Sequence, residues 1–123
     1  MKVLAHIALL LVVINSCAVV NTEETIRGKV IHRSCATIAV QVIGNKHTSL
    51  GQASWQQADG KPVYKNVFSV GNRCAFPTSL SEGKEFQFTV MKSDPSNDDC
   101  MVCEMWDNPP TKVLLVRVKN TEE

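Results

Sequence analysis

Two stretches decide the fold, Thr37-Ile38-Ala39-Val40-Gln41-Val42 and Glu85-Phe86-Gln87-Phe88-Thr89-Val90, because apolar residues recur at every second position in both. Successive side chains of a β-strand point to opposite faces, so this period of two predicts strands with one face in the core. The last strand of the chain has the same pattern. We expect the following side chains to lie mostly inside: Ile38, Val40, Val42, Phe86, Phe88, Val90, Val116 and Val118.

Similar alternation outside these stretches predicts strands over 25–32, 63–70 and 111–119, with a weaker candidate over 50–55. Turn-forming residues separate the strands, and Asp59-Gly60-Lys61-Pro62 is a strong turn. Helical periodicity is absent, although a short helix between Gln52 and Ala58 stays open. The sequence therefore predicts an all-β fold of about six strands. It is either a small disulfide-stapled barrel, similar to the oligonucleotide/oligosaccharide-binding (OB) type, or a sandwich.

The composition is that of one ordinary folded domain. The chain has 123 residues, of which 44% are hydrophobic and 20% are charged. Its 13 Lys and Arg residues against 12 Asp and Glu residues give a formal net charge of +1. Nucleic-acid-binding proteins usually carry a basic face or stripe, so the near-neutral balance argues against a nucleic acid as partner.

The N-terminus has the three parts of a secretory signal peptide. Lys2 supplies a positive start, residues 3–14 are apolar apart from one histidine, and Ser16 and Ala18 occupy the small-residue positions before a cleavage site. We therefore predict a signal peptide over 1–18, a single β-domain over 19–123 and a secreted, extracellular protein. The apolar run is shorter than the roughly 20 residues that a membrane-spanning helix needs, so we predict no membrane span.

Two other interpretations of the N-terminus stay open. The four residues 14–17, Ile-Asn-Ser-Cys, loosely resemble a bacterial lipobox. In that case Cys17 would be lipidated and would anchor the protein to an envelope membrane. Alternatively, residues 3–14 form a buried helix of the mature fold.

Cleavage after residue 18 removes one of the five cysteines and leaves an even number, as complete pairing in a secreted protein requires. A bond inside the C-x-x-C motif at 100–103 would close a very small loop. Bonds to distant cysteines close loops of tens of residues, which the chain-entropy model values at about 3–4 kcal/mol each. We expect each motif cysteine to bond to one of the two distant cysteines, with the choice between them open. The four residues are Cys35, Cys74, Cys100 and Cys103.

Other functions of these cysteines fit the sequence less well. A redox C-x-x-C motif normally opens a helix after a strand in a βαβ unit, and no such unit is visible here. A four-cysteine zinc site usually has two C-x-x-C pairs, whereas Cys35 and Cys74 are isolated. We therefore predict neither a metal nor a cofactor.

Several short motifs resemble one known module. They are Ile26-Arg27-Gly28-Lys29-Val30, Cys74-Ala75-Phe76-Pro77 followed by Leu80 and Gly83-Lys84-Glu85-Phe86, and the late cysteine pair. Their order is similar to the netrin-like module, the OB-type barrel shared with tissue inhibitors of metalloproteinases, over about half of the mature chain. The resemblance implies a barrel. Those inhibitors begin with a C-x-C whose first cysteine chelates the protease zinc. The predicted mature start at Val19 lacks this motif, so no inhibitory residue carries over.

No pattern of catalytic residues is recognisable. Of the two histidines in the mature chain, we expect His32 to be a strand-end residue with a local hydrogen bond and His47 to be a solvated loop residue. The chain has no recognisable Ser-His-Asp motif, phosphate-binding loop, dinucleotide fingerprint or paired-carboxylate motif. We predict no catalytic residue and therefore a protein that is not an enzyme.

Three groups of side chains are candidates for binding. An acidic group in and after the turn at 94–99 could hold calcium. Three aromatic residues could bind a carbohydrate or a peptide, and a basic strand face could bind an anionic matrix polymer. In each case we expect a simpler role. The acidic group is expected to be a solvated turn, the aromatic residues to pack in the core, and the basic residues to form a solvated strand face. The groups are Asp94, Asp98, Asp99, Glu104 and Asp107; Trp55, Tyr64 and Trp106; and Arg27, Lys29 and Arg33.

These features favour a secreted, non-enzymatic extracellular β-domain, which serves as a structural or binding protein of an extracellular matrix or fluid. Its expected partner is an extracellular protein or glycan. The alternatives are a protease inhibitor of netrin-like architecture and a lipid-anchored bacterial envelope protein.

The N-terminus of the native protein tests the predicted compartment. Mass spectrometry should find a chain that begins at Val19, because signal peptidase cleaves after small residues such as Ala18. A diacylglyceryl group on Cys17 would contradict secretion and establish the lipid anchor instead, whereas a free amino-terminal Cys17 would reopen the protease-inhibitor interpretation.

Overall fold

The computed structural model describes residues 24–93, 100–101 and 103–119. In these ranges the protein is all-β, as predicted, with one short 3-10 helix. The stretch at 52–58 that could have held a short helix contains a strand instead. No helix in the described part is long and apolar enough to cross a membrane. The elements are β1 (Ile26–Arg33), β2 (Ile38–Val42), β3 (Gln52–Gln56), β4 (Val63–Val70), η1 (Arg73–Ala75), β5 (Glu85–Met91) and β6 (Val113–Val118).

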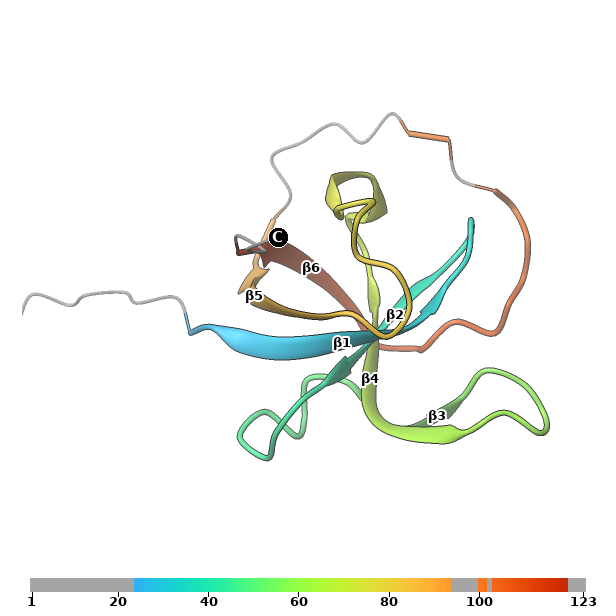
Figure 1. Ribbon diagram of the computed structural model, residues 1–123, viewed down its shortest axis with the longest axis horizontal. Helices are drawn as coiled ribbons and strands as arrows, with labels where there is room; N and C mark the ends of the chain where they lie inside the picture. The colour runs from blue at the N-terminus through green and yellow to red at the C-terminus, as the bar shows by residue number, and fades with distance from the viewer. Residues whose placement is uncertain (1–23, 94–99, 102, 120–123) are drawn as a thin grey trace, which may run out of the picture.

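Five of the strands close into a barrel (Figure 1). The pairs β1–β2, β2–β4, β1–β5 and β5–β6 are antiparallel, and the parallel pair β4–β6 completes the ring. Among the described strands, β3 pairs with β4 alone and is an addition to the ring. Of the two predicted architectures, the barrel is therefore the correct one. Closure gives the strands of the ring a partner on both sides and so removes the free edges that an open sheet would expose.

Aromatic rings fill the barrel. Phe88 packs against Phe68 and Phe86, with ring centroids 5.4 and 5.6 Å apart. Strand β1 passes close to these rings at Gly28, where a Cβ atom would lie 2.8 Å from Val40 and 2.9 Å from Phe88. Glycine is therefore required at this point of the alternating pattern, because any side chain would collide with the core.

The prediction of the core is wrong at one position. Val90 is 37% exposed, whereas its neighbour Thr89 is 1% exposed. The alternation of β5 holds as far as Phe88 and then breaks, because Val90 is one residue from the end of the strand, where the barrel interior meets solvent. Val118 is only half-buried but packs against the core. The other predicted core residues are buried: Ile38, Val40, Val42, Phe86, Phe88 and Val116.

The chain that follows β4 packs over the barrel core. Phe76 and Leu80, which follow η1, belong to the same buried cluster as Phe86. Asn72 is 2% exposed and forms two hydrogen bonds with the backbone of β6. Its Nδ2 donates to the carbonyl of Val116 (2.7 Å), and its Oδ1 accepts from the N–H of the same residue (3.0 Å). Beyond the end of β4, the side chain of Asn72 thus forms with β6 the two backbone hydrogen bonds that a neighbouring strand would otherwise form.

Strand β4 bends at Asn66 and pairs with two different strands, β3 and β2. The backbone of Asn66 has a φ of 57°, and its side-chain oxygen accepts a hydrogen bond from the N–H of Gly51 (2.7 Å). A Cβ atom on Gly51 would lie 2.4 Å from the backbone nitrogen of Val67, so only glycine fits there. Residues 63–65, before the bend, pair with β3, and residues 68–69 pair with β2; Val67, directly after the bend, pairs with both strands. A second, smaller core forms beside the barrel from Ala39, Trp55 and Val67.

Replacement of Asn72 with alanine should lower the free energy of unfolding by about 2–4 kcal/mol, because two buried backbone groups of Val116 would lose their partner. Urea denaturation at pH 7 measures the change. Asn45→Ala, in an exposed turn, is the matched control. A loss no larger than that of the control would contradict the role given to Asn72.

Candidate functional site

Two disulfides attach the connection between β5 and β6 to the barrel. Cys35 bonds to Cys103 with their Cα atoms 5.6 Å apart, and Cys74 bonds to Cys100 with their Cα atoms 5.5 Å apart. Both cysteines of the C-x-x-C motif are thus bonded across the fold, and the structure decides between the two long-range pairings that the sequence left open. We call residues 100–101 and 103–110 the tethered segment.

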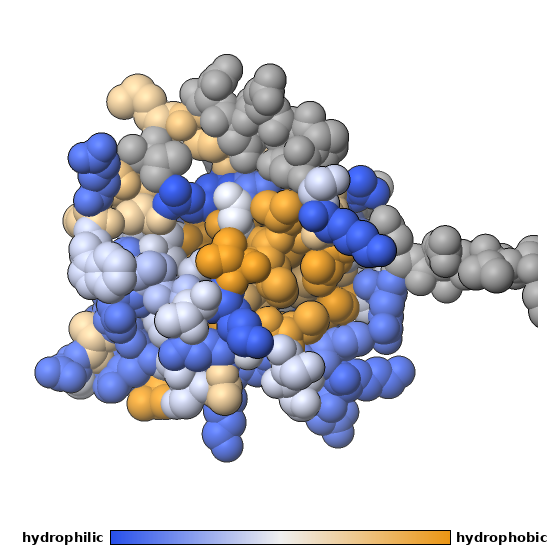
Figure 2. Space-filling model, turned by 180° about the vertical axis from the view of Figure 1, so that it is seen from behind, coloured by the Kyte–Doolittle hydropathy of each residue, from blue (hydrophilic) through white to orange (hydrophobic). Residues whose placement is uncertain are grey.

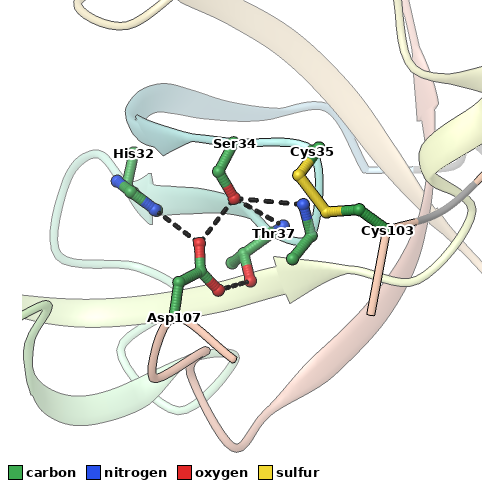
Figure 3. The surroundings of a disulfide bond; sticks show 7 residues. His32, Ser34, Cys35, Thr37, Cys103 and Asp107 are labelled. Atoms are coloured by element: carbon green, nitrogen blue, oxygen red, sulfur yellow. Dashed lines mark hydrogen bonds and ion pairs between the residues drawn. A yellow bond between two sulfur atoms is a disulfide. The ribbon is translucent and has the colours of Figure 1, made fainter. Parts of the chain in front are cut away.

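Asp107 of the tethered segment places its carboxylate in the turn between β1 and β2 (Figure 3). The hydroxyls of Ser34 and Thr37 donate hydrogen bonds to it, the former over 2.5 Å. Nε2 of His32 lies 2.8 Å from Oδ2 of the same carboxylate. The hydroxyl oxygen of Ser34 also accepts hydrogen bonds from the N–H groups of Ala36 and Thr37 (3.1 and 3.0 Å). The carboxylate, whose side chain is 8% exposed, therefore joins the tethered segment to the whole turn.

The turn holds Asp107 in its ionised form. Burial raises the pKa of this carboxyl group. The hydrogen bonds from Ser34, Thr37 and His32, together with the electrostatic interaction with His32, outweigh burial and keep the pKa below its usual 3.8. Since each of these groups donates to the carboxylate, protonation of Asp107 would weaken the attachment.

His32 has partners that are distant in sequence, so the expectation of a local hydrogen bond is wrong. Its Nε2 contacts Asp107, 75 residues further along the chain. Its Nδ1 lies 3.7 Å from a carboxylate oxygen of Glu82, and its ring centroid is 6.2 Å from that of Trp55. The imidazole is thus held between two carboxylates.

His47 is also less exposed than expected. Its side chain is 23% exposed, and its Nε2 lies 3.2 Å from the carboxylate of Glu24. Its carbonyl accepts a hydrogen bond from the side chain of Asn66 (2.8 Å). These contacts hold the loop before β3 and do not involve the tethered segment.

His32, Ser34 and Asp107 are the residue types of a serine-hydrolase triad, but their connections differ. In a triad the histidine lies between the other two and accepts the proton of the serine hydroxyl. Here the serine hydroxyl and the imidazole both contact the carboxylate, and no hydrogen bond joins Ser34 to His32 among the described residues. The hydroxyl donates its proton to Asp107 and is not activated as a nucleophile. The arrangement is suited to holding a loop.

The three candidate aromatic residues do not act as one group. Trp55 is 3% exposed and donates its indole N–H to the carbonyl of Asn108 (2.9 Å), which attaches the tethered segment to β3. Tyr64 is half-buried against the same small core. Trp106, by contrast, is 79% exposed. The expectation of core packing is therefore correct for Trp55 and wrong for Trp106, whose backbone is held by the attachments on either side of it.

The tethered segment exposes large apolar side chains. Met101 is 99% exposed, Met105 54% and Trp106 79%. Apolar side chains also gather at the centre of the face seen from behind the view of Figure 1, with hydrophilic ones around them (Figure 2). Large apolar side chains left in water, as on the tethered segment, are typical of surfaces that bind another molecule.

Of the acidic and basic candidates, Asp107 and Arg33 form hydrogen bonds that hold other parts of the fold. Asp107 is engaged as described, Glu104 is exposed, and the three remaining acidic candidates, at 94, 98 and 99, lie outside the described residues. Within the described ranges no three His, Cys, Asp or Glu side chains converge on a possible metal position. Arg27 forms an exposed ion pair with Glu85 (3.0 Å), which agrees with a solvated face. Arg33 instead donates hydrogen bonds of 2.9 and 2.7 Å to carbonyls of the segment 77–80.

Sequence reasoning missed the cluster around Asp107. The spacing of Ser34 and Thr37 is that of a serine turn, in which the hydroxyl accepts hydrogen bonds from N–H groups two and three residues later. That local signal was available in the sequence. The partner of the turn, Asp107, comes from a distant segment, and nothing in its neighbourhood marks it.

Comparison with protein-family models found no match, and comparison with curated proteins found no relative.

Asp107→Asn should destabilise the protein by about 1–3 kcal/mol at pH 5, because the buried donors around the carboxylate lose a charged acceptor. The folded pKa is below the unfolded one, so this stabilisation is complete above pH 5 and is lost as the pH falls through the folded pKa. The difference between variant and wild type should therefore shrink between pH 5 and pH 2.

Urea denaturation at both pH values measures this difference. Glu104→Gln, which removes an exposed carboxylate of the same segment, is the control and should have little effect at either pH. A difference between wild type and Asp107→Asn that stays constant with pH would show that the carboxylate charge is not what the turn binds.

Proposed function

We propose that this protein is a secreted, non-enzymatic extracellular binding protein whose tethered segment docks onto a partner protein. One observation carries the proposal. Met101, Met105 and Trp106 are exposed on a segment that two disulfides and a buried carboxylate fix to a closed barrel. Folding leaves these apolar groups in water, and a partner surface would bury them.

The attachment of the segment supports binding on energetic grounds. A flexible loop loses conformational freedom when it binds, and that loss lowers its affinity. The bonds at Cys103 and Asp107 restrict the backbone next to Trp106 before any partner arrives. Tryptophan is enriched among residues that dominate binding energy, and methionine side chains adapt to irregular surfaces. This combination favours a protein as partner.

The compartment is supported by two features. The disulfides Cys35–Cys103 and Cys74–Cys100 are consistent with an oxidising, extracellular location. The pattern over 1–18 is that of a signal peptide, which delivers a chain to that location.

A non-enzymatic role agrees with the geometry around Asp107, where Ser34 donates its proton to the carboxylate that His32 also contacts. The netrin-like protease inhibitor and the lipid-anchored envelope protein stay alternatives that rest on the sequence alone.

Trp106→Ser should reduce capture of the partner roughly tenfold or more, as expected when a tryptophan central to an interface is truncated. The experiment immobilises the protein, exposes it to the extracellular fluid in which it occurs, and quantifies retained proteins by mass spectrometry. Val63→Ser, which truncates a 58%-exposed apolar side chain at the start of β4, is the control. Equal retention by wild type and Trp106→Ser would refute the proposal, even if both bound a protein.

A further inference from the structure

A groove of about 240 Å³ lies directly beside the tethered segment. One wall is formed by Pro109 and Pro110, at the end of that segment, and another by the end of β4. The start of β2 and Val113 of β6 complete it. The groove therefore lies where the tethered segment returns to the barrel, three residues beyond Trp106.

The walls of the groove are mainly apolar. Ile38 and Val70 line it, and Val113 is 61% exposed beside it. The two prolines have no N–H group and so offer no backbone donor. The nearby N–H groups of Ser69 and Gly71 already donate to carbonyls of the chain before and in β6 (both 2.8 Å). The groove thus presents apolar surface, with few free polar groups along it.

Arg73 is the charged residue that lines this groove. It is half-buried, yet it forms no ion pair or side-chain hydrogen bond with any residue in the described ranges. Arg27 and Arg33, by contrast, have the partners described above. The disulfide at the adjacent Cys74 holds the backbone of Arg73 in place. A guanidinium has five N–H donors. The half-buried guanidinium of Arg73, which has no partner among the described residues, is therefore suited to bind a carboxylate.

We infer that the groove binds a peptide segment of the partner protein in which an apolar side chain stands next to a carboxylate. The carboxylate pairs with Arg73, and the apolar side chain packs against Pro109, Pro110 and Val113. The volume is below the roughly 300–1,000 Å³ of typical small-molecule sites, and it suits one or two side chains of a longer chain. The inference rests on the proposed function and names the chemistry of its partner.

The test uses the full disulfide-bonded protein, labelled with nitrogen-15, and three blocked tripeptides. Acetyl-Leu-Leu-Glu-amide should cause saturable shifts of backbone amide signals at the groove, among them Ile38, Gly71 and Val113. Acetyl-Leu-Leu-Gln-amide, which lacks the charge, and acetyl-Gly-Gly-Glu-amide, which lacks the apolar side chains, should each bind about tenfold more weakly. Equal affinity for the Leu-Leu-Glu and Leu-Leu-Gln peptides, or no saturable shift at the groove, would overturn the inference.

Variants separate this inference from the proposed function. Arg73→Gln should weaken binding of the Leu-Leu-Glu peptide about tenfold and abolish its preference over the Leu-Leu-Gln peptide. The matched control is Lys112→Gln, which removes an exposed positive charge next to Val113 outside the groove lining. Trp106→Ser should leave tripeptide binding unchanged, because its side chain does not line the groove. Loss of binding in the Lys112 variant equal to that in the Arg73 variant would show a general charge effect and refute the site.

Discussion

The Cys35–Cys103 disulfide is the constraint on which the rest of the candidate site depends. It joins the β1–β2 turn to the connection between β5 and β6, two parts of the chain separated by 68 residues. With this bond in place, the Asp107 carboxylate needs only a local adjustment to reach the hydroxyls of Ser34 and Thr37. Without it, the same contacts would have to overcome the entropy of closing a long loop. The covalent bond and the buried charge thus act together on one short segment.

The barrel explains why the attachment is effective. Its strands are bonded on both sides, so the turn that receives Cys103 and Asp107 belongs to a closed and well-packed unit. The bend of β4 at Asn66 gives the β3–β4 hairpin a course outside the ring, and this brings Trp55 to the carbonyl of Asn108. One tryptophan is buried in support of the tethered segment, while the other, Trp106, is exposed by that segment.

Sequence patterns predicted the strands well because alternation is a local property of the chain. The class of fold, the core around Phe86 and Phe88 and the burial of Ile38 all follow from it. The pattern fails at Val90, since exposure near a strand end depends on where the barrel stops and not on the residue type.

The candidate site was less predictable. Nothing local distinguishes Trp55 from Trp106, because burial is decided by which segment of the fold covers each ring. The role of Asp107 was hidden for a similar reason, since its partners lie at least 70 residues earlier in the chain. The number and spacing of the cysteines were the one sequence signal that linked these distant parts. That signal left open which of the two motif cysteines bonds to Cys35 and which to Cys74.

Mapping of the disulfides in the native protein tests this account most directly. Trypsin separates Cys35 from Cys74, and cyanogen bromide cleaves after Met101, between Cys100 and Cys103. Without reduction, the digest should contain the peptide 34–46 linked to 102–105, and the peptide 74–84 linked to 93–101. A bond between Cys100 and Cys103, or the exchanged pairing in which Cys35 bonds to Cys100, would contradict the attachment on which the site and its proposed function rest.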